Sequence, residues 1–388
     1  PVACEHSARP VAAVSRRREA HDEDACTRIA EAGNRPRPVV LVAKRRPLLD
    51  GHMLAPRHES RAGAALRDLL GEGLQVRRGR DGHPPIVRVP SRPMRVLLLV
   101  NATAASVTAR TRVLIRKTLA ARHDVEVAET SRRGHATRLA RAAANDGFDV
   151  VAVLAGDGTL NEAADGLAGT DTALAPLPGG STNVYARTLG YPTDVTAATN
   201  KLLASLDRGA FTRIGLGRVD ARHFLFHVGL GFDAAVIRRV ERYGELKRHA
   251  SHPLHVVAAF ETWFRHYDRS KPRFDLVLGS GERIDGVYFA IVSKTSPYTF
   301  LGPRPLHVAP HASLHSRLAL TAFKRLDVLT LVGGAASAMR SGKFLRSRRG
   351  IVHRHDIDAI AVEGRGPFPY QVDGDDLGDA AHLDIGYE

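Results

Sequence analysis

The sequence contains little of what disulfide-stabilised or membrane-spanning proteins depend on. It has two cysteines among 388 residues, Cys4 and Cys26, and both lie near the N-terminus. They leave no later partners for a disulfide framework, a metal knuckle or a thiol nucleophile, so a reducing, cytoplasmic compartment fits. The longest mainly apolar run, residues 328–339, has 12 residues and two glycines, which is too short to cross a bilayer.

The chain instead has an excess of positive charge. It contains 56 basic and 41 acidic residues, a formal net charge of +15, and 44% of its residues are hydrophobic. This composition is typical of a globular protein with room for two domains. The charge attracts polyanions, whether nucleic acid, an acidic membrane or phosphorylated substrates. Because aromatic residues make up only 6% and no nucleic-acid-binding module is recognisable, we do not expect a nucleic-acid partner.

Residues 1–93 differ in amino-acid composition from the rest of the chain. They hold 18 basic and 11 acidic residues and are rich in arginine, proline and alanine, without a recurring period. The segment lacks the order of charged, apolar and small residues of a signal peptide, and its acidic residues argue against a transit peptide. We expect a basic, mostly disordered extension or upstream sequence; the alternative is an arm attracted to membranes.

Residues 94–215 show the alternation of strand and helix patterns that βαβ units produce. Strands are predicted at residues 95–100, 124–128 and 149–154. Helices are predicted at residues 109–122, 135–145, 161–167 and 181–189. We therefore predict a Rossmann-like α/β nucleotide-binding domain with a mainly parallel sheet, whose ligands bind outside the carboxyl ends of the strands.

Residues 216–388 are rich in strands. Successive strands without intervening helices predict a mainly antiparallel β-sandwich. The strands are expected at residues 222–228, 273–278, 286–292, 318–323, 357–362 and 370–372. Helices are expected at residues 233–243 and 254–267. We place the boundary near Gly215 and allow the last residues to return to the first domain.

Two glycine-rich turns carry the chemistry of the first domain. Gly156 and Gly158 follow an apolar strand and precede a helix, so backbone amides can come close to a phosphate. Asp157 between them would repel phosphate unless a cation intervened, which predicts Mg²⁺ held jointly with the nucleotide. A second turn, residues 178–183, offers hydroxyl and amide groups to the same crevice. Tight packing without a ligand is the structural alternative.

The order of four motifs resembles the lipid-kinase family that includes diacylglycerol kinases and sphingosine kinases. Residues 156–162 resemble its nucleotide loop, and residues 178–183 resemble its second glycine turn, with Ser181 in place of threonine. Residues 229–234 and 372–375 resemble two further family segments. The resemblance implies ATP and Mg²⁺ as cofactors, a lipid alcohol as substrate, peripheral contact with an anionic membrane and a possible homodimer. It also implies that the β-rich domain at residues 216–388 is the lipid-binding domain.

The resemblance also implies the residues of the site. Nucleotide contacts are expected from Asn101, Thr130, Gly156, Asp157, Gly158, Thr159, Asn161, Glu162, Gly180, Ser181, Thr182 and Asn183, with Asp157 as the metal ligand. Asp373 is expected to be the general base that takes the proton of the lipid hydroxyl. Asp375, on the same side of an extended segment, is expected to hold Asp373 or a metal. A simple turn at Asp373 is the alternative.

Several positions depart from the family pattern. Asn101 opens a loop that lacks the family's proline and glycine, and Ala155 replaces the first glycine of the nucleotide loop. Val184 stands where an aspartate is frequent. Residues 314–317 (Leu-His-Ser-Arg) lie where bacterial relatives have an Asp-Gly pair of a structural magnesium site, so the sequence does not predict that site here.

Two basic clusters are interpreted mainly as solvent-exposed surface without a specific function. His249, His252, His255 and His266 lack compact metal-ligand spacing and fit an exposed helix face. The basic run at residues 340–349 fits a solvated surface, or a contact with anionic lipid.

We predict an ATP-dependent lipid kinase that phosphorylates diacylglycerol to phosphatidate. Two alternatives stay open. NAD kinase shares the Gly-Asp-Gly-Thr loop, but Asn161, Glu162 and the second turn favour the lipid group. A nucleotide-binding regulatory protein without catalysis is suggested by the altered loops at Asn101 and Ala155 and by the missing Asp-Gly pair at residues 315–316. Retention of Asp157 and Asp373 speaks against it.

Overall fold

The computed structural model describes residues 39–42, 86–87, 92–104, 106–242, 261–262, 267–268, 270–327, 339 and 350–388. All of these belong to one compact unit that starts at Pro38. The four histidines named above and the basic run at residues 340–349 lie outside the described residues, as does most of the helix predicted at residues 254–267.

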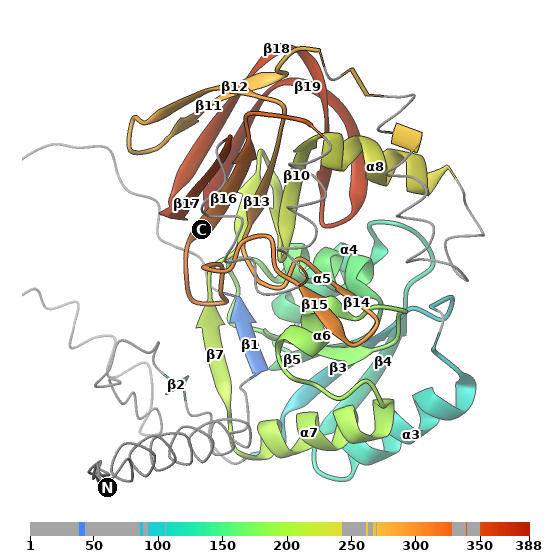
Figure 1. Ribbon diagram of the computed structural model, residues 1–388. Coiled ribbons are helices and arrows are strands. Elements are labelled where there is room, and N and C mark those ends of the chain that lie inside the picture. Colours follow the sequence, from blue (N-terminus) through green and yellow to red (C-terminus); the bar gives the residue numbers. More distant parts are fainter. Residues whose placement is uncertain are drawn as a thin grey trace, which may run out of the picture. The chain divides into compact units, whose positions relative to one another are not determined.

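The first domain is built on a seven-stranded sheet with the order β2-β7-β1-β6-β5-β3-β4 (Figure 1). Four neighbouring strands are parallel: β3 (Arg95–Val100), β4 (Asp124–Glu129), β5 (Val150–Ala155) and β6 (Ala173–Pro178). β5 and β6 are buried at every position, as expected for parallel strands covered on both faces. The predicted Rossmann-like α/β fold is confirmed.

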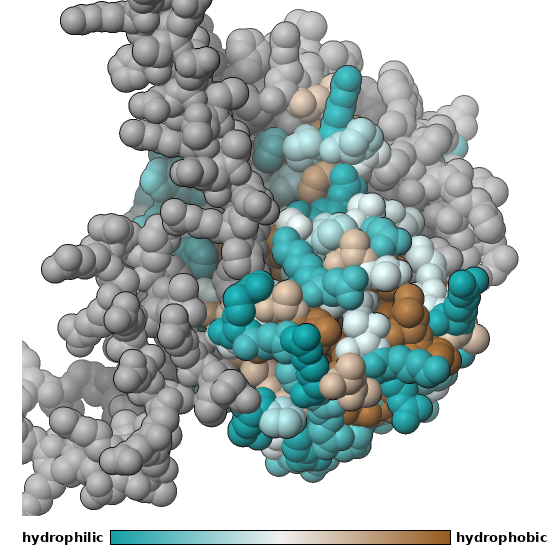
Figure 2. Space-filling model, turned by 90° about the horizontal axis from the view of Figure 1, so that it is seen from below, coloured by the Kyte–Doolittle hydropathy of each residue, from teal (hydrophilic) through white to brown (hydrophobic). Residues whose placement is uncertain are grey.

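Helices connect these strands and cover the sheet. They are α3 (Ala109–Ala120), α4 (His135–Asn145), α5 (Asp157–Leu167), α6 (Val184–Thr188) and α7 (Val195–Asp207). α7, which the sequence analysis did not predict, begins at an N-cap, Asp194, whose carboxylate accepts the N–H of Ala197 at 2.8 Å. Figure 2 looks onto the side of the domain that carries α3 and α7, where hydrophilic residues surround smaller hydrophobic patches.

Two short strands of the first sheet come from the predicted extension. β1 (Val39–Val42) lies between β6 and β7 (Phe211–Ile214), antiparallel to the former and parallel to the latter. β2 (Ile86–Val87) pairs with the other edge of β7. Within residues 1–93, which were predicted to be a mostly disordered extension, these two strands pair with the first sheet. Their backbones pair with strand edges that would otherwise be left without partners.

The second domain contains a ten-stranded antiparallel sheet. Eight strands follow the order β17-β16-β13-β10-β18-β19-β8-β9, and β11 and β12 branch from β18. Its centre is a long hairpin of β18 (Ala359–Val372) and β19 (Asp375–Tyr387). The predicted antiparallel β-rich domain is confirmed, and its strands belong to one continuous sheet.

The remaining elements complete this domain. The other strands of the sheet are β8 (Gly217–Val219), β9 (Arg222–Phe224), β10 (His227–Gly231), β11 (Phe274–Leu278), β12 (Arg283–Val287), β13 (Phe289–Ser293), β16 (Leu318–Phe323) and β17 (Ile351–Ile357). A separate hairpin consists of β14 (Thr299–Leu301) and β15 (Arg304–Leu306), and helix α8 (Phe232–Glu241) follows β10.

The chain changes from the first sheet to the second between β7 and β8. Leu216 and Glu388 exchange two backbone hydrogen bonds of 2.8 and 2.9 Å, and β19 pairs with β8 up to Tyr387. A Cβ atom on Gly215 would lie 2.4 Å from the carbonyl oxygen of Glu388, so this position requires glycine. The last residues thus stay in the second sheet, and the allowance that they return to the first domain is wrong.

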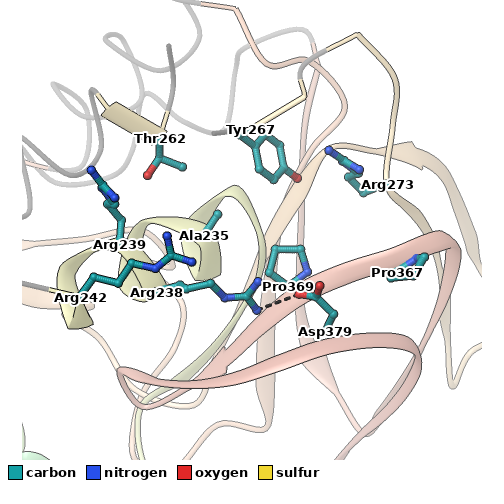
Figure 3. A pocket seen from close by; sticks show the side chains of 10 residues that line it. All are labelled: Ala235, Arg238, Arg239, Arg242, Thr262, Tyr267, Arg273, Pro367, Pro369 and Asp379. Atoms are coloured by element: carbon teal, nitrogen blue, oxygen red, sulfur yellow. Dashed lines mark hydrogen bonds and ion pairs between the residues drawn. The ribbon is translucent and has the colours of Figure 1, made fainter. Parts of the chain in front are cut away.

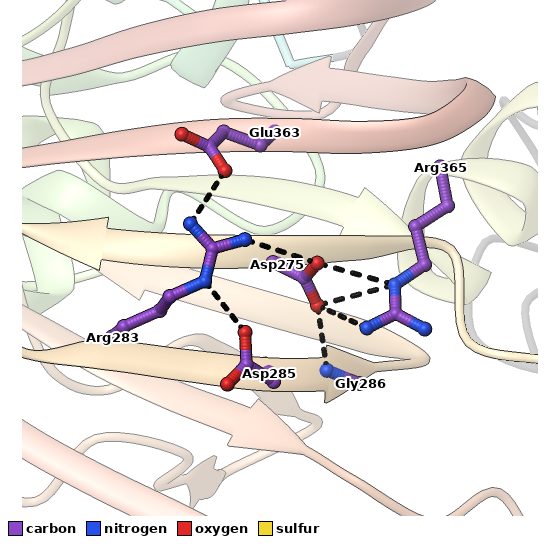
Figure 4. Close-up of polar contacts among 6 residues, drawn as sticks. All are labelled: Asp275, Arg283, Asp285, Gly286, Glu363 and Arg365. Carbon is purple, nitrogen blue, oxygen red and sulfur yellow. Dashed lines mark hydrogen bonds and ion pairs between the residues drawn. The ribbon is translucent and has the colours of Figure 1, made fainter.

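An ionic network fixes the β11–β12 hairpin on β18 (Figure 4). The nearly buried carboxylate of Asp275 accepts hydrogen bonds from the Gly286 amide at 2.7 Å and from Arg365 at 2.8 Å, and Arg283 lies 3.3 Å away. Burial disfavours the charged carboxylate, but these donors outweigh it and lower the pKa of Asp275.

A second charged cluster joins the two sheets. On one side of the His223 ring, Nδ1 lies 2.9 Å from Asp165 of α5, and on the other side Nε2 lies 3.1 Å from Glu388. Burial favours the neutral ring, but hydrogen bonds to both carboxylates outweigh it and raise the pKa of His223. The same contacts lower the pKa values of Asp165 and Glu388 against the effect of burial. α5, which follows the first glycine turn, is thereby tied to the second sheet.

Candidate active site

A polar cavity of about 300 Å³ lies at the carboxyl ends of the parallel strands. It is lined by residues that follow β3, β4 and β5 and by the first residue of β19: Asn101, Thr103, Thr130, Ser131, Arg132, Arg133, Gly158, Thr159, Glu162 and Asp375. This is the edge at which open α/β sheets bind their ligands. Six of the predicted site residues line the cavity: Asn101, Thr130, Gly158, Thr159, Glu162 and Asp375.

Asn101 organises one wall of this cavity. Its Nδ2 donates to the hydroxyl of Thr159 at 3.1 Å, and its Oδ1 accepts the backbone N–H and the hydroxyl of Thr103 at 3.1 and 2.8 Å. The loop after β3 is therefore joined to the first turn of α5 despite its missing proline and glycine. Opposite them, Glu162 Oε2 accepts the N–H of Ala136 at 3.3 Å, at the start of α4.

The glycines of the two turns have different roles. A Cβ atom on Gly180 would lie 2.7 Å from the Cα of Gly156, so Gly180 has to be glycine because the two turns pack against each other. A Cβ atom on Gly156 would lie 3.6 Å from the Cα of Gly180, which is an ordinary packing distance. A Cβ atom on Gly158 would meet nothing within 4 Å, and Gly158 lines the cavity. The packing interpretation thus holds for Gly180, whereas Gly158 leaves the backbone open to a ligand.

Asp157 joins the two turns through backbone contacts. Its Oδ2 accepts the N–H of Val184 at 2.9 Å and its Oδ1 accepts the N–H of Tyr185 at 3.1 Å, at the start of α6. Burial raises the pKa of Asp157, and the two amide donors oppose that rise. Each oxygen thus accepts one N–H and keeps a lone pair, so the predicted metal contact of Asp157 stays a prediction. Among the described residues, no cluster of three His, Cys, Asp or Glu side chains could hold a metal ion.

The second turn is closed on itself. The Asn183 side chain accepts the N–H of Gly180 and donates to its carbonyl, both at 2.8 Å. None of Gly180, Ser181, Thr182 and Asn183 lines the cavity, and neither does Asn161, whose side-chain amide is buried without a hydrogen-bond partner. Their predicted nucleotide contacts stay predictions, whereas their contacts in the structure are with the protein.

Asp373 occupies a hairpin turn and not the cavity. Asp373 and Gly374 both have positive φ angles, 51° and 87°, and connect the paired residues Val372 and Asp375, which makes a two-residue hairpin turn. The Asp373 carboxylate accepts three backbone N–H groups, from Leu225, Phe226 and His227, at 2.8, 3.0 and 2.8 Å. Burial raises its pKa to about 7, against the effect of the three amides.

These contacts give the two aspartates different surroundings, and the predicted role of Asp373 as general base stays a prediction. Asp373 anchors the hairpin to the segment before β10, whereas Asp375 lines the cavity. Arg133 donates to one oxygen of Asp375 at 2.8 Å and Arg222 donates to the other at 2.6 Å. Asp375 therefore does not hold Asp373. With Glu162, it is one of the two carboxylates that line the cavity.

The motif at residues 229–234 supports this hairpin. Asp233 accepts hydrogen bonds from Tyr298 and from Gln371, each at 2.8 Å. Gln371 in turn accepts the N–H of Gly374 at 2.8 Å through its Oε1. The aspartate of this motif thus positions the turn that carries Asp375.

The sequence analysis missed Thr103, Ser131, Arg132 and Arg133, which also line the cavity. Arg132 and Arg133 lie in the loop that begins with Thr130, directly after β4. Polar residues just beyond the carboxyl end of a parallel strand indicate a ligand site and could have identified them. Together with the amides at the start of α5, the two guanidinium groups make this cavity suited to an anion.

A second cavity, of about 320 Å³, lies beside α8 and β19 and is lined by four arginines (Figure 3). Arg238 donates to Asp376 and to Asp379 at 2.8 Å each, and Arg239 donates to Glu261 at 2.7 Å. Because side chains alternate along a strand, Asp376 binds Arg238 of this cavity while its neighbour Asp375 lines the first one. The start of β19 is thus held from both faces.

The fold and the first cavity define a two-domain protein with a polar, anion-compatible site at the end of a parallel sheet. Residues 95–218 match the family model described as diacylglycerol kinase catalytic domain. The match is confined to these residues, which are therefore similar to a diacylglycerol kinase catalytic domain.

Individual relatives agree with this assignment. The chain is similar to the diacylglycerol kinase of Bacillus subtilis (strain 168), with 33% identity over 121 residues, which are 30% of this chain and 39% of that protein. It is also 33% identical to the diacylglycerol kinase of Staphylococcus saprophyticus over 98 residues, which are 25% and 31% of the two chains. The matched part thus spans less than half of these relatives.

A solved structure shows the same fold over more of the chain. A diacylglycerol kinase from Bacillus anthracis str. Sterne aligns with 76% of this chain and 94% of its own, with a TM-score of 0.58 and 21% sequence identity. Within the described residues, no helix is long and apolar enough to cross a membrane.

Proposed function

We propose that this chain is an ATP-dependent lipid kinase that transfers the γ-phosphate of Mg·ATP to a lipid hydroxyl, with diacylglycerol as the substrate and phosphatidate as the product. The observation that carries the proposal is the cavity at the carboxyl ends of β3, β4 and β5, which combines two arginines, an open glycine and a carboxylate. The family match and the relatives' names support the same reaction.

In this mechanism the cavity binds the phosphates and Asp375 acts on the acceptor. Gly158 lets the nucleotide approach the backbone at the start of α5, and Arg132 and Arg133 neutralise phosphate charge. Asp375 takes the proton of the lipid hydroxyl while Arg222 keeps the carboxylate oriented. A general base of this kind contributes roughly 10² to 10⁴-fold to the rate.

The metal enters this proposal as part of the Mg·ATP substrate. Because both oxygens of Asp157 already accept backbone N–H groups, we assign no step to a metal ion bound by that residue. Asp157 supports transfer by holding the two glycine turns together.

The test is transfer of labelled γ-phosphate from Mg·ATP to a panel of micellar lipid alcohols and to NAD. Labelling of diacylglycerol supports the proposal, and labelling of NAD alone supports the NAD kinase alternative. ATP binding without transfer to any acceptor supports the catalytically inactive regulatory protein.

We also propose that the second cavity contacts the headgroups of an anionic membrane, because Arg242 and Arg273 line it beside the paired Arg238 and Arg239. Flotation with vesicles of phosphatidylglycerol and phosphatidylcholine tests this. Binding should require the anionic lipid, weaken with salt and fall in an Arg242→Ala, Arg273→Ala double variant. Equal binding to purely neutral vesicles would contradict the proposal.

A further inference from the structure

Lys294, directly after β13, is a buried cation with no part in the proposed reaction. Its side chain is among the largest fully buried ones in the described residues, with 1% of the residue exposed. A buried ammonium is costly unless its hydrogen-bonding groups are all satisfied. The structure therefore has to supply acceptors for it.

The acceptors all come from one short loop. Lys294 Nζ donates to the backbone carbonyls of Ser313, Leu314 and Ser316 at 3.1, 2.9 and 3.1 Å. The loop is closed by its own serines: Ser316 Oγ accepts the N–H of Ser313 at 2.8 Å, and Ser313 Oγ accepts the N–H of Ser316 at 3.0 Å. Carbonyl oxygens that converge in this way form a site for a cation.

The number of acceptors matches the protonated form of Lys294. An ammonium group has three N–H donors for three carbonyls, whereas a neutral amine has two and would leave one carbonyl unpaired. Burial lowers the pKa of Lys294 to about 7. Full pairing with the loop therefore requires the charged side chain that burial alone disfavours.

The loop is also the place where the family resemblance implies a metal. Residues 314–317 stand where bacterial relatives have an Asp-Gly pair of a structural magnesium site, and residues 313–316 contain no acidic side chain. Oxygen donors without a carboxylate and with an ammonium already at their centre do not fit Mg²⁺. We propose that the Lys294 ammonium takes the place of a structural divalent cation in this protein and fixes the loop at residues 313–316.

The position of Lys294 connects this loop to the hairpin of the candidate active site. The Lys294 N–H donates to the carbonyl of Phe226 at 2.7 Å, and Phe226 donates its own N–H to Asp373 at 3.0 Å. The loop and the hairpin turn thus meet at the same backbone segment. Lys294 is a positioning residue in this scheme and makes no contact with substrate.

The first test needs no variant. The melting temperature of the intact chain, measured without nucleotide, should be the same in EDTA and in millimolar Mg²⁺ or Ca²⁺. A fall in EDTA that Mg²⁺ reverses would show a structural metal site and overturn the proposal.

The second test removes the ammonium. Lys294→Met keeps the length of the side chain but leaves three carbonyls without a donor, so the melting temperature should fall by roughly 5 °C or more. Lys201→Met is the matched control, because Lys201 donates to one carbonyl, that of Gly190, in an exposed setting and should change little. An unchanged melting temperature in Lys294→Met would refute the proposal.

Chemical rescue separates the cation from simple loss of packing. In Lys294→Ala, n-propylammonium restores the missing atoms and should raise the melting temperature by several degrees. Tetramethylammonium has the same charge but no N–H group, and should fail to do so. Rescue by both ions, or by neither in a folded variant, would contradict an ammonium site. If this variant does not fold, the metal titration of the intact chain still decides.

Discussion

The substitution Asp373→Asn separates the two aspartates of the hairpin turn most clearly. Asparagine tolerates the positive φ of 51° and keeps one carbonyl oxygen for backbone donors. It replaces the other oxygen, which accepts the Leu225 N–H at 2.8 Å, with an NH₂ group. A buried donor then faces another donor, which costs about 2 kcal/mol.

For a domain of this size, the cost corresponds to a fall in melting temperature of roughly 4–8 °C. The assay is thermal unfolding at pH 8, above the pKa of about 7 of the Asp373 carboxyl, so that the parent residue is ionised. We expect the folded fraction of Asp373→Asn to retain phosphate transfer within a few fold. Asp375→Asn should behave oppositely, because its partly exposed pairs with Arg133 and Arg222 contribute only about 0–1 kcal/mol each. Unchanged stability of Asp373→Asn with complete loss of transfer would refute this reasoning and return the role of base to Asp373.

Three further predictions follow from the packing and charges described above. Gly180→Ala should unfold at a clearly lower temperature, whereas Gly158→Ala should keep its stability and lose affinity for ATP in calorimetry. Loss of stability in Gly158→Ala and loss of ATP affinity alone in Gly180→Ala would contradict the two glycine roles. The pKa of His223 is raised above 6.5 in the folded protein, so its contribution to stability should be complete below pH 6.5. This contribution should be lost as the pH rises through the pKa of His223 in the folded protein. In urea unfolding, the His223→Gln variant should lack this decline in stability. Asp275→Asn should lower the free energy of unfolding by about 1–3 kcal/mol at pH 7. The difference in unfolding free energy from the parent chain should shrink as the pH falls through the lowered pKa of Asp275. A constant difference down to pH 3 would argue against the ionic network.

Three strands of the first sheet, β3, β4 and β5, could be predicted from the sequence because they are short, contain apolar residues and are separated by helical patterns. β6 was not predicted, although it is buried at every position. The predicted strand at residues 95–100 has the observed bounds, and that at residues 149–154 is shifted by one residue. The place of β1 could not be predicted, because pairing between distant segments leaves no local pattern. α7 was missed although Asp194 offers a recognisable cap.

The site was predicted less completely, for physical reasons. The glycines 156, 158 and 180 are alike in sequence, and only their surroundings show which pack together and which faces the cavity. Asp373 and Asp375 flank the same glycine, and an extended segment would point both to one side. The positive φ angles of the turn separate them instead, so that one meets three backbone amides and the other meets the cavity.

The most direct measurement of the central claim is the initial rate of phosphate transfer from Mg·ATP to diacylglycerol for the intact chain, Asp375→Asn and Asp384→Asn. Asp384 is an exposed carboxylate on the same strand and serves as the control. We expect transfer by the intact chain and by the control, and a loss of roughly 100-fold or more in Asp375→Asn with ATP still bound. Equal rates in all three proteins would contradict Asp375 as the base, and no transfer by the intact chain would contradict the proposed lipid kinase activity toward diacylglycerol.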